Sequence, residues 1–288
     1  MQWFSGKNNF KLHSIENNQF YTTIVGNNAI SNLSIDEILL SHLGTIKSVD
    51  LMYSGGTDSE LVLEVLSRNK IKVNPCIIKL TVDDAIVNTH DLYYAEKYCK
   101  EHDYKLYYFT LDLKPFILEN QYLDYITKYL INQPHVASHF WLIKQLEFPI
   151  MGGDWPWVHT HKENKVLSPI RLDYSFYDKF MLDNNINGIG NMLGHSIESL
   201  LYFIKLQLSY NHFNDYMVKY MMYKTISPNI EKRFRSYGWE GINQRVIPIS
   251  KIRTSLILQN KNIKPIINWD EKICEILNTK VTQNDSFI

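Results

Sequence analysis

The chain has 288 residues, 45% of them hydrophobic, and its equal numbers of acidic and basic side chains give a formal net charge of zero. A chain of this size can bury a substantial core, as one large domain or two modest ones. The charge balance gives no general attraction to nucleic acid, and no apolar run approaches the roughly 20 residues that span a bilayer. The N-terminus also lacks the layout of a secretory signal, so we expect no membrane association and a cytoplasmic location.

The first elements in chain order are two short strands and a helix. Residues 11–15 and 20–25 predict the strands, and residues 16–18 predict the turn between them. Residues 34–37, Ser-Ile-Asp-Glu, have capping-box form and predict a helix that reaches about His42. We therefore expect a small N-terminal extension over residues 1–46.

The next segment is residues 48–59, Ser-Val-Asp-Leu-Met-Tyr-Ser-Gly-Gly-Thr-Asp-Ser. Val49, Leu51 and Tyr53 predict a buried strand, and the apolar pattern of residues 60–66 predicts the helix that follows the turn. A strand that passes through a glycine-containing turn into a helix is the setting in which proteins bind phosphate groups.

The composition of this turn fits that interpretation. Gly55 and Gly56 can adopt backbone angles that other residues avoid, and they let a ligand approach the main chain closely. The N–H groups and the positive end of the helix then face an anion. Asp58 would repel a bare phosphate, so we interpret it as a ligand of Mg²⁺, which prefers oxygen donors and accompanies nucleotide phosphates. Hydroxyl donors are supplied by Ser54, Thr57 and Ser59.

The six residues Ser54-Gly55-Gly56-Thr57-Asp58-Ser59 resemble the SGGxDS loop of the PP-loop ATP pyrophosphatases, a superfamily that activates substrates by adenylation. This resemblance implies an adenine nucleotide alpha-hydrolase-like fold, ATP and Mg²⁺ as cofactors, and binding of ATP by these six residues. The Walker pattern GxxxxGK[ST] is absent. The chain also lacks the paired cysteines on which relatives that thiolate tRNA or make a deazapurine commonly depend, since its cysteines are the widely spaced Cys76, Cys99 and Cys274.

Beyond the loop, predicted strands alternate with predicted helices. This alternation predicts an α/β fold with a doubly wound parallel sheet. We expect the PP-loop ATP-binding domain over residues 47–170 and a mostly helical C-terminal region over residues 171–288. The predicted elements are a strand at 72–82, a helix at about 89–102, a strand at 105–111, a helical stretch at 115–146 and a strand at 148–151.

A second glycine-containing turn follows the last of these strands, in a position where open α/β sheets bind ligands. We expect Gly152 and Gly153 to bind the cofactor, and Asp154 to join Asp58 in holding Mg²⁺ against the β- and γ-phosphates. The turn is similar to the GEGxDE loop of asparagine synthetase. It lacks the first glutamate of that loop, which argues against aspartate as the substrate.

Residues 219–240 are similar in order to the C-terminal region of asparagine synthetase, and closer to stand-alone synthetase-like proteins of phages. Adenylation and pyrophosphate release require cations that neutralise developing phosphate charge. The candidate catalytic residues are Lys224, Arg233 and Arg235.

The resemblance implies an AMP-forming ligase in which a substrate oxygen attacks the α-phosphate of ATP and a nitrogen nucleophile then displaces AMP. The partner would be a small molecule with a carboxylate or carbonyl oxygen. Position 2 is Gln2 where the glutaminase domain of asparagine synthetase has its cysteine. The nitrogen would therefore come from free ammonia, from a separate glutaminase, or from another nucleophile such as an amine. Two alternatives stay open, namely modification of a nucleobase in tRNA or phage DNA, and a noncatalytic module that binds adenine nucleotides.

Overall fold

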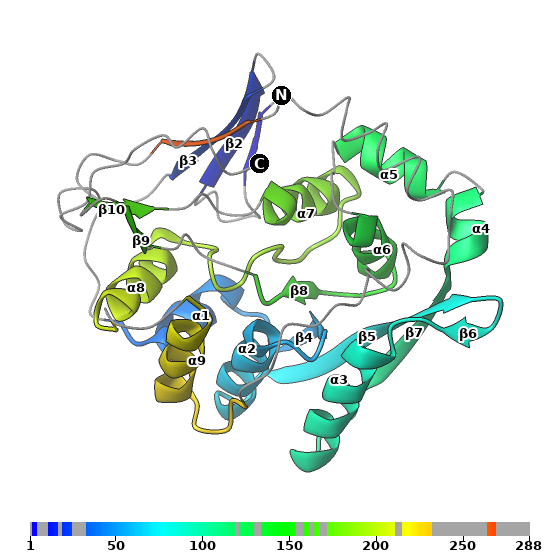
Figure 1. Ribbon diagram of the computed structural model, residues 1–288, viewed down its shortest axis with the longest axis horizontal. Helices are drawn as coiled ribbons and strands as arrows, with labels where there is room; N and C mark the ends of the chain where they lie inside the picture. The colour runs from blue at the N-terminus through cyan, green and yellow to red at the C-terminus, as the bar shows by residue number, and fades with distance from the viewer. Residues whose placement is uncertain are drawn as a thin grey trace.

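The computed structural model of the chain is shown in Figure 1. Three of the predicted site residues, Asp154, Arg233 and Arg235, lie outside the described residues. The residues that the structure describes are 2–4, 11–16, 19–24, 33–118, 121–129, 134–153, 158–161, 164–167, 172–210, 215–231 and 264–268.

A five-stranded sheet forms the centre of the molecule. β4 (Ser48–Met52) pairs with both β5 (Lys72–Val82) and β8 (Pro149–Met151), and β7 (Tyr107–Asp112) pairs with β5. All of these pairings are parallel, while β6 (Ala85–Ile86) folds back antiparallel on the end of β5. The order of the parallel strands, β7–β5–β4–β8, means that the chain builds outward from β4 and then returns to the other side of β4. The topological switch point therefore lies between β4 and β8.

Helices cover both faces of this sheet and share two separate cores with it. Leu51 belongs to the first core and Met52 to the second, because successive strand residues point to opposite faces. The predicted α/β fold with a doubly wound parallel sheet is thus confirmed. The first core is shared with α1 (Ile35–Leu43), α2 (Thr57–Arg68), α3 (Thr89–Glu101), α8 (Ile197–Leu208) and α9 (Asp215–Ile226). The second is shared with α4 (Leu113–Leu118), α5 (Gln121–Tyr129), α6 (Pro134–Ile143) and α7 (Leu172–Asp183).

A second sheet joins the two ends of the described chain. β1 (Gln2–Phe4), β2 (Lys11–Glu16) and β3 (Gln19–Ile24) form an antiparallel meander, and β11 (Lys264–Asn268) adds to β3 in parallel. Figure 1 shows this sheet at the top of the molecule, beyond α7. The C-terminal region is therefore helical at α7, α8 and α9 and also contributes one strand. A short hairpin, β9 (Val158–His161) and β10 (Asn164–Leu167), follows the central sheet along the chain.

Most of the predicted elements occur where the sequence placed them. The strand predicted at residues 72–82 is β5, and the capping box opens α1, where the Ser34 hydroxyl accepts from the Glu37 amide at 3.3 Å. The stretch predicted as helical over residues 115–146 begins at Leu113 and contains three helices, α4, α5 and α6. The domain boundaries stay a prediction. Among the helices that the structure describes, none has the length and hydropathy that crossing a membrane requires.

Candidate functional site

The two glycine-containing loops meet at the switch point of the sheet. β4 and β8 end side by side, with Met52 opposite Met151, so the loops that follow them leave the same edge. A Cβ atom added to Gly152 would lie 2.9 Å from the backbone nitrogen of Ser59. Glycine at position 152 is therefore what allows the second loop to lie against the first turn of α2.

The two glycines of the first loop have different roles. Gly55 has a φ of 69°, and a Cβ on it would lie 2.7 Å from the backbone nitrogen of Ala95 in α3. Gly56 has a φ of −84°, which any residue can adopt, so in this structure it does not use the backbone angles that only glycine reaches readily. A Cβ on Gly56 would meet only the Ser54 hydroxyl, at 3.2 Å, among the described residues. Gly55 thus packs the loop on α3, while Gly56 leaves the main chain open at the N-cap of α2.

The hydroxyl groups of the loop are not equivalent. Ser59 is buried, and its hydroxyl donates to the Gly56 carbonyl at 2.9 Å, so it stabilises the first turn of the helix. Ser54 is exposed, and its hydroxyl accepts from the Gly56 amide at 3.4 Å. Thr57 is half-buried at the start of α2. Ser54 and Thr57 are therefore better placed than Ser59 to donate to a bound anion.

Asp58 lies in the first turn of α2, where both of its carboxylate oxygens are engaged by α9. The Lys219 ammonium lies 2.6 Å from one carboxylate oxygen and 2.7 Å from the other, and the Tyr223 hydroxyl donates at 2.5 Å. Lys219 and Tyr223 are four residues apart on α9 and so share one face of that helix. The side chains of Asp58 and Lys219 keep exposed fractions of 29% and 20%. This three-residue cluster closes one side of the loop.

The donor set around Asp58 does not fit a magnesium ion as it stands. A cation bound to this carboxylate would compete for its oxygens with the Lys219 ammonium and the Tyr223 hydroxyl. Within the described part of the chain, no cluster of three or more His, Cys, Asp or Glu side chains is arranged to hold a metal ion. Metal binding by Asp58 and Asp154 therefore stays a prediction from the sequence.

The contacts of Lys224 place it at the end of α9. Its ammonium donates to the carbonyl of Pro228 and, at 3.2 Å, to that of Ile230. A lysine near a helix C-terminus commonly satisfies carbonyls that the helix leaves without partners. Among the described residues, no contact between Lys224 and the loop supports a catalytic role. That role stays a prediction, as do the roles of Arg233 and Arg235.

Polar contacts hold the C-terminal end of α9 against α2. Glu64 of α2 accepts from the Tyr98 hydroxyl at 2.5 Å, from Asn229 at 3.2 Å and from Ser227 at 3.4 Å. Burial, and then the hydrogen bond to Glu64, raise the pKa of Tyr98, which therefore stays a donor. On the same helix, Arg68 donates to the Ile226 carbonyl at 2.8 Å. These contacts fix the position from which α9 presents Lys219 to the loop.

Sequence reasoning missed Lys219 and Tyr223. The only local signal was their spacing of four residues within the Tyr- and Met-rich segment 215–226, a pattern that is usually core. Sequence reasoning also missed the glycine-rich segment 188–194, which lies alongside β8 at the edge of the central sheet. There Met151 donates to the Ile189 carbonyl at 3.0 Å, and Leu193 donates to the Gly152 carbonyl at 2.9 Å. A Cβ on Gly153, which has a φ of 90°, would overlap Asn191 of this segment.

Comparison with known proteins gives matches to solved structures alone. No protein-family model matches the chain, and no curated protein sequence does. The U34-tRNA thiolase NcsA of Methanococcus maripaludis, solved with its [4Fe-4S] cluster, is 13% identical, with a TM-score of 0.36 over 79% of this chain and 77% of that one. A predicted subunit of tRNA methyltransferase from Methanocaldococcus jannaschii is 22% identical, with a TM-score of 0.33 over 55% of this chain and 74% of that one. Likeness at this level concerns the path of the chain and not its activity.

Proposed function

We propose that the protein is an ATP-dependent enzyme of the AMP-forming type, with the triphosphate of ATP bound at the sheet edge where the loop 54–59 meets the loop 152–153. The observation that carries the proposal is the contact of these two loops at the switch point between β4 and β8. In doubly wound sheets this crevice is where ligands bind. The SGGxDS resemblance of the first loop selects ATP among such ligands.

The proposed binding relies on the main chain at the start of α2. The first amides of a helix have no acceptor within the helix, and the helix dipole adds a partial positive charge there. Because Gly56 carries no side chain, phosphate oxygens can approach these amides closely. The exposed hydroxyl of Ser54 lies at the entrance to the same turn.

In the proposed reaction, an oxygen of the acceptor attacks the α-phosphorus and forms a new P–O bond. The bond from that phosphorus to the oxygen bridging it to the β-phosphorus breaks, and pyrophosphate leaves with the bonding electrons. A nitrogen nucleophile then attacks the activated carbon and expels AMP, which takes the former acceptor oxygen with it. The asparagine-synthetase-like form of this reaction uses a small carboxylate as acceptor and rests on the sequence motifs alone.

A second acceptor class, a nucleobase, is favoured by aromatic side chains beside the loop. Gly55 packs on α3, and the neighbouring face of that helix carries His90, Tyr93 and Tyr94. The ring centroid of Tyr94 lies 5.0 Å from that of His90 and 5.3 Å from that of Tyr93. The Tyr93 residue is 61% exposed. Exposed aromatic rings are surfaces on which nucleobases stack. The two structures described above are named for tRNA modification, and we include tRNA among the acceptors to be tested.

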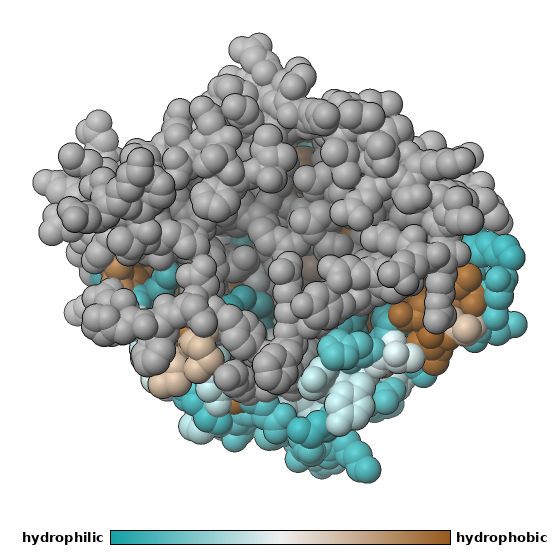
Figure 2. Space-filling view, viewed as in Figure 1, coloured by the Kyte–Doolittle hydropathy of each residue, from teal (hydrophilic) through white to brown (hydrophobic). Residues whose placement is uncertain are grey.

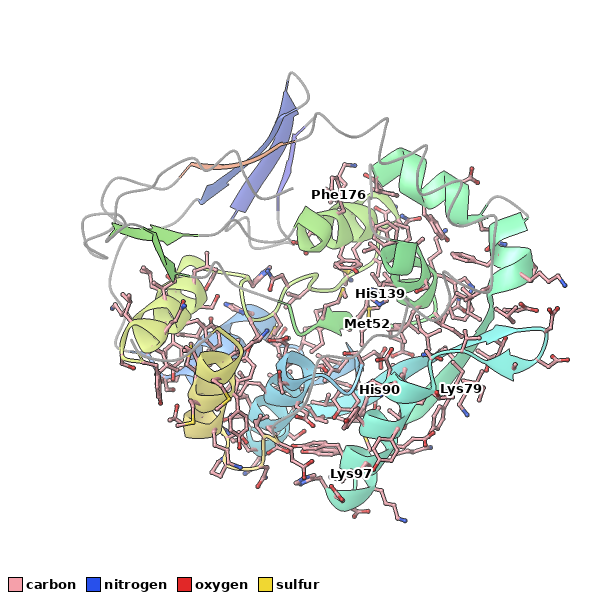
Figure 3. All side chains as sticks on the ribbon, in the orientation of Figure 1. Met52, Lys79, His90, Lys97, His139 and Phe176 are labelled. Atoms are coloured by element: carbon pink, nitrogen blue, oxygen red, sulfur yellow. The ribbon has the colours of Figure 1, made fainter. Side chains whose placement is uncertain are left out.

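The figures show how this face relates to the site. Figure 3 labels His90, in the first turn of α3, and Met52, the last residue of β4, which is the strand that leads into the loop. In Figure 2 the described surface at the bottom of the view, over α3, is mostly hydrophilic. An exposed tyrosine on such a surface is therefore not part of a broad apolar patch.

Product analysis with α-labelled ATP tests the proposal. The protein is incubated with Mg²⁺ and ATP, and with glutamate plus ammonium, with unmodified tRNA, or with single-stranded DNA. We expect AMP and pyrophosphate with one of these acceptors, and the acceptor that stimulates turnover identifies the class. Accumulation of ADP would contradict the proposal. Tight ATP binding without turnover on any acceptor would favour the noncatalytic nucleotide-binding module.

A further inference from the structure

We propose that Lys219 supplies the positive charge that binds the leaving pyrophosphate group at the loop, and that Asp58 and Tyr223 hold its ammonium in place. This inference rests on the proposed function, because it assumes that the anion at the loop is part of ATP. It assigns Asp58 a different role from the metal ligation that the sequence predicts.

Asp58 places a negative charge in the loop. A carboxylate in the first turn of a helix is favourable for the helix itself, because it interacts with the positive end of the dipole. The same carboxylate repels a phosphate group that approaches the same turn. Asp58 therefore needs a cation close to it before the loop can bind an anion, and Lys219 lies 2.6 Å from its nearer carboxylate oxygen.

Lys219 reaches the loop from a neighbouring helix. It belongs to α9, which packs against α2 and α8, as Figure 1 also shows. Tyr223, one turn further along α9, donates to the carboxylate oxygen that lies nearer to Lys219. The ammonium of Lys219 is thereby fixed in position, while its side chain keeps 20% of its surface exposed beside the loop. A fixed cation contributes more to anion binding than a mobile one, because less side-chain entropy is lost when the ligand binds.

Two other lysines on the helices that contact the loop, Lys224 and Lys97, have partners elsewhere. Lys224 is engaged by backbone carbonyls at the end of α9. Lys97 of α3 is paired with Glu231 at 2.9 Å and with Glu101 at 3.8 Å. Among the described residues, the ion pair with loop 54–59 comes from Lys219. The geometry therefore assigns the cationic role to Lys219.

The test measures binding of inorganic pyrophosphate by calorimetry in buffer with EDTA, where no divalent cation contributes. We expect the wild-type protein to bind pyrophosphate, and Lys219→Met to bind it about 10- to 100-fold more weakly, as for the loss of a charge-assisted hydrogen bond. Lys219→Arg should retain most of the affinity, because the positive charge is kept. Tyr223→Phe, which removes only the positioning hydroxyl, should weaken binding by a smaller factor.

Lys205→Met is the matched control, since it removes the same charge from an exposed position on the neighbouring helix α8. It should leave pyrophosphate binding unchanged. Thermal unfolding of each variant shows whether it is folded. If Lys219→Met does not fold, the double variant Asp58→Asn/Lys219→Met removes both charges of the pair, and it must still bind pyrophosphate more weakly than the single variant Asp58→Asn.

The outcomes separate this inference from the proposed function. Equal pyrophosphate affinity in the wild type and Lys219→Met would overturn the role of Lys219. Binding by the wild type with Mg²⁺ but not with EDTA would also overturn it, and it would leave the proposed ATP site in place. Failure of the wild type to bind either ATP or pyrophosphate under both conditions would overturn both proposals.

Discussion

Gly152 lies against Ser59 so closely that a methyl group at position 152 would come within 2.9 Å of the Ser59 amide nitrogen. The contact joins the carboxyl ends of β8 and β4 through their loops, and it fixes the distance between the two halves of the proposed phosphate site. The residue at position 152 is glycine because a side chain there would separate the two backbones.

Gly152→Ala should therefore push the second loop away from α2. The added methyl would meet backbone atoms of Asp58 and Ser59, which cannot rotate aside as a flexible side chain can. We expect a loss of about 1–3 kcal/mol in the free energy of unfolding, typical of overpacking, measured by urea denaturation. Gly44→Ala offers a comparison, because a Cβ there meets no atom within 4 Å and only the strain of its φ of 59° is added. Equal free-energy losses in the two variants would argue against steric contact as the cause.

Gly56→Val should affect ligand binding more than folding. The backbone angles of Gly56 are open to valine, and its Cβ position faces little but the Ser54 hydroxyl. We expect a stability loss of about 1 kcal/mol, as for a poor N-cap residue. ATP affinity, measured by calorimetry, should fall by about tenfold or more, since phosphate contacts with the helix amides are blocked. Unchanged ATP affinity in folded protein would remove the loop from the site.

The two aspartates of the loops should behave differently if Asp58 serves mainly to hold Lys219. Asp154→Asn should raise the Mg²⁺ concentration needed for half-maximal ATP binding, as its predicted metal-binding role requires. Asp58→Asn should instead leave that Mg²⁺ concentration unchanged, because the Asp58 carboxylate is paired with the Lys219 ammonium and not with a metal ion. Calorimetric titrations at several Mg²⁺ concentrations distinguish the two effects. An equal shift of the Mg²⁺ dependence in both variants would support the shared metal site that the sequence predicts.

Two of the cysteines should be inert in the folded protein. Burial raises the pKa of Cys76 and of Cys99 to about 12, from an ordinary value of 9.0. Since the thiolate is the reactive form, almost none is present at about pH 8. We expect a thiol reagent to modify neither residue at that pH, and to modify all three cysteines of the chain after denaturation in urea. Rapid modification of Cys76 or Cys99 in native protein, located by mass spectrometry, would contradict the expectation.

The pairing of Asp36 with Arg68 should make stability depend on acidic pH. The hydrogen bond from Arg68 lowers the pKa of Asp36 below its ordinary value of 3.8, so the ionised carboxylate stabilises the folded state. This contribution is fully present above that ordinary value and is lost as the pH falls through it toward the lower pKa of the folded state. We expect it to be about 0.5–1 kcal/mol, because both side chains are partly exposed.

The measurement compares urea unfolding of the wild type and Asp36→Asn at neutral pH and near pH 3. The wild type should be the more stable protein at neutral pH, and the difference between the two should shrink on acidification. Lys114 is paired with the exposed Asp83, so Asp83→Asn serves as a control that should show little difference at either pH. A difference for Asp36→Asn that does not change with pH would contradict the assignment.

The elements with local signals could be predicted from the sequence. The glycine turn after an apolar strand, the capping box at Ser34 and the alternation of strands with helices each depend on residues within a few positions of one another. Such signals specified the doubly wound sheet and the order of its strands along the chain. They also specified that two glycine-containing loops follow strands, which is enough to predict that they share one edge of a parallel sheet.

The contacts between the loop and residues far away in the sequence follow from how the helices pack. Lys219 and Asp58 are 161 positions apart, and nothing in either segment identifies the other as its partner. β11 pairs with β3 across a still longer separation in the sequence. A strand therefore occurs in a region whose other described elements are helices. The cationic residue of the site depends on how α9 packs on α2, and that packing follows from burial of Phe203, Met222 and Tyr223 in a common core. Hydrophobic burial is not directional, so a sequence pattern predicts that these side chains are buried but not which helix face they meet.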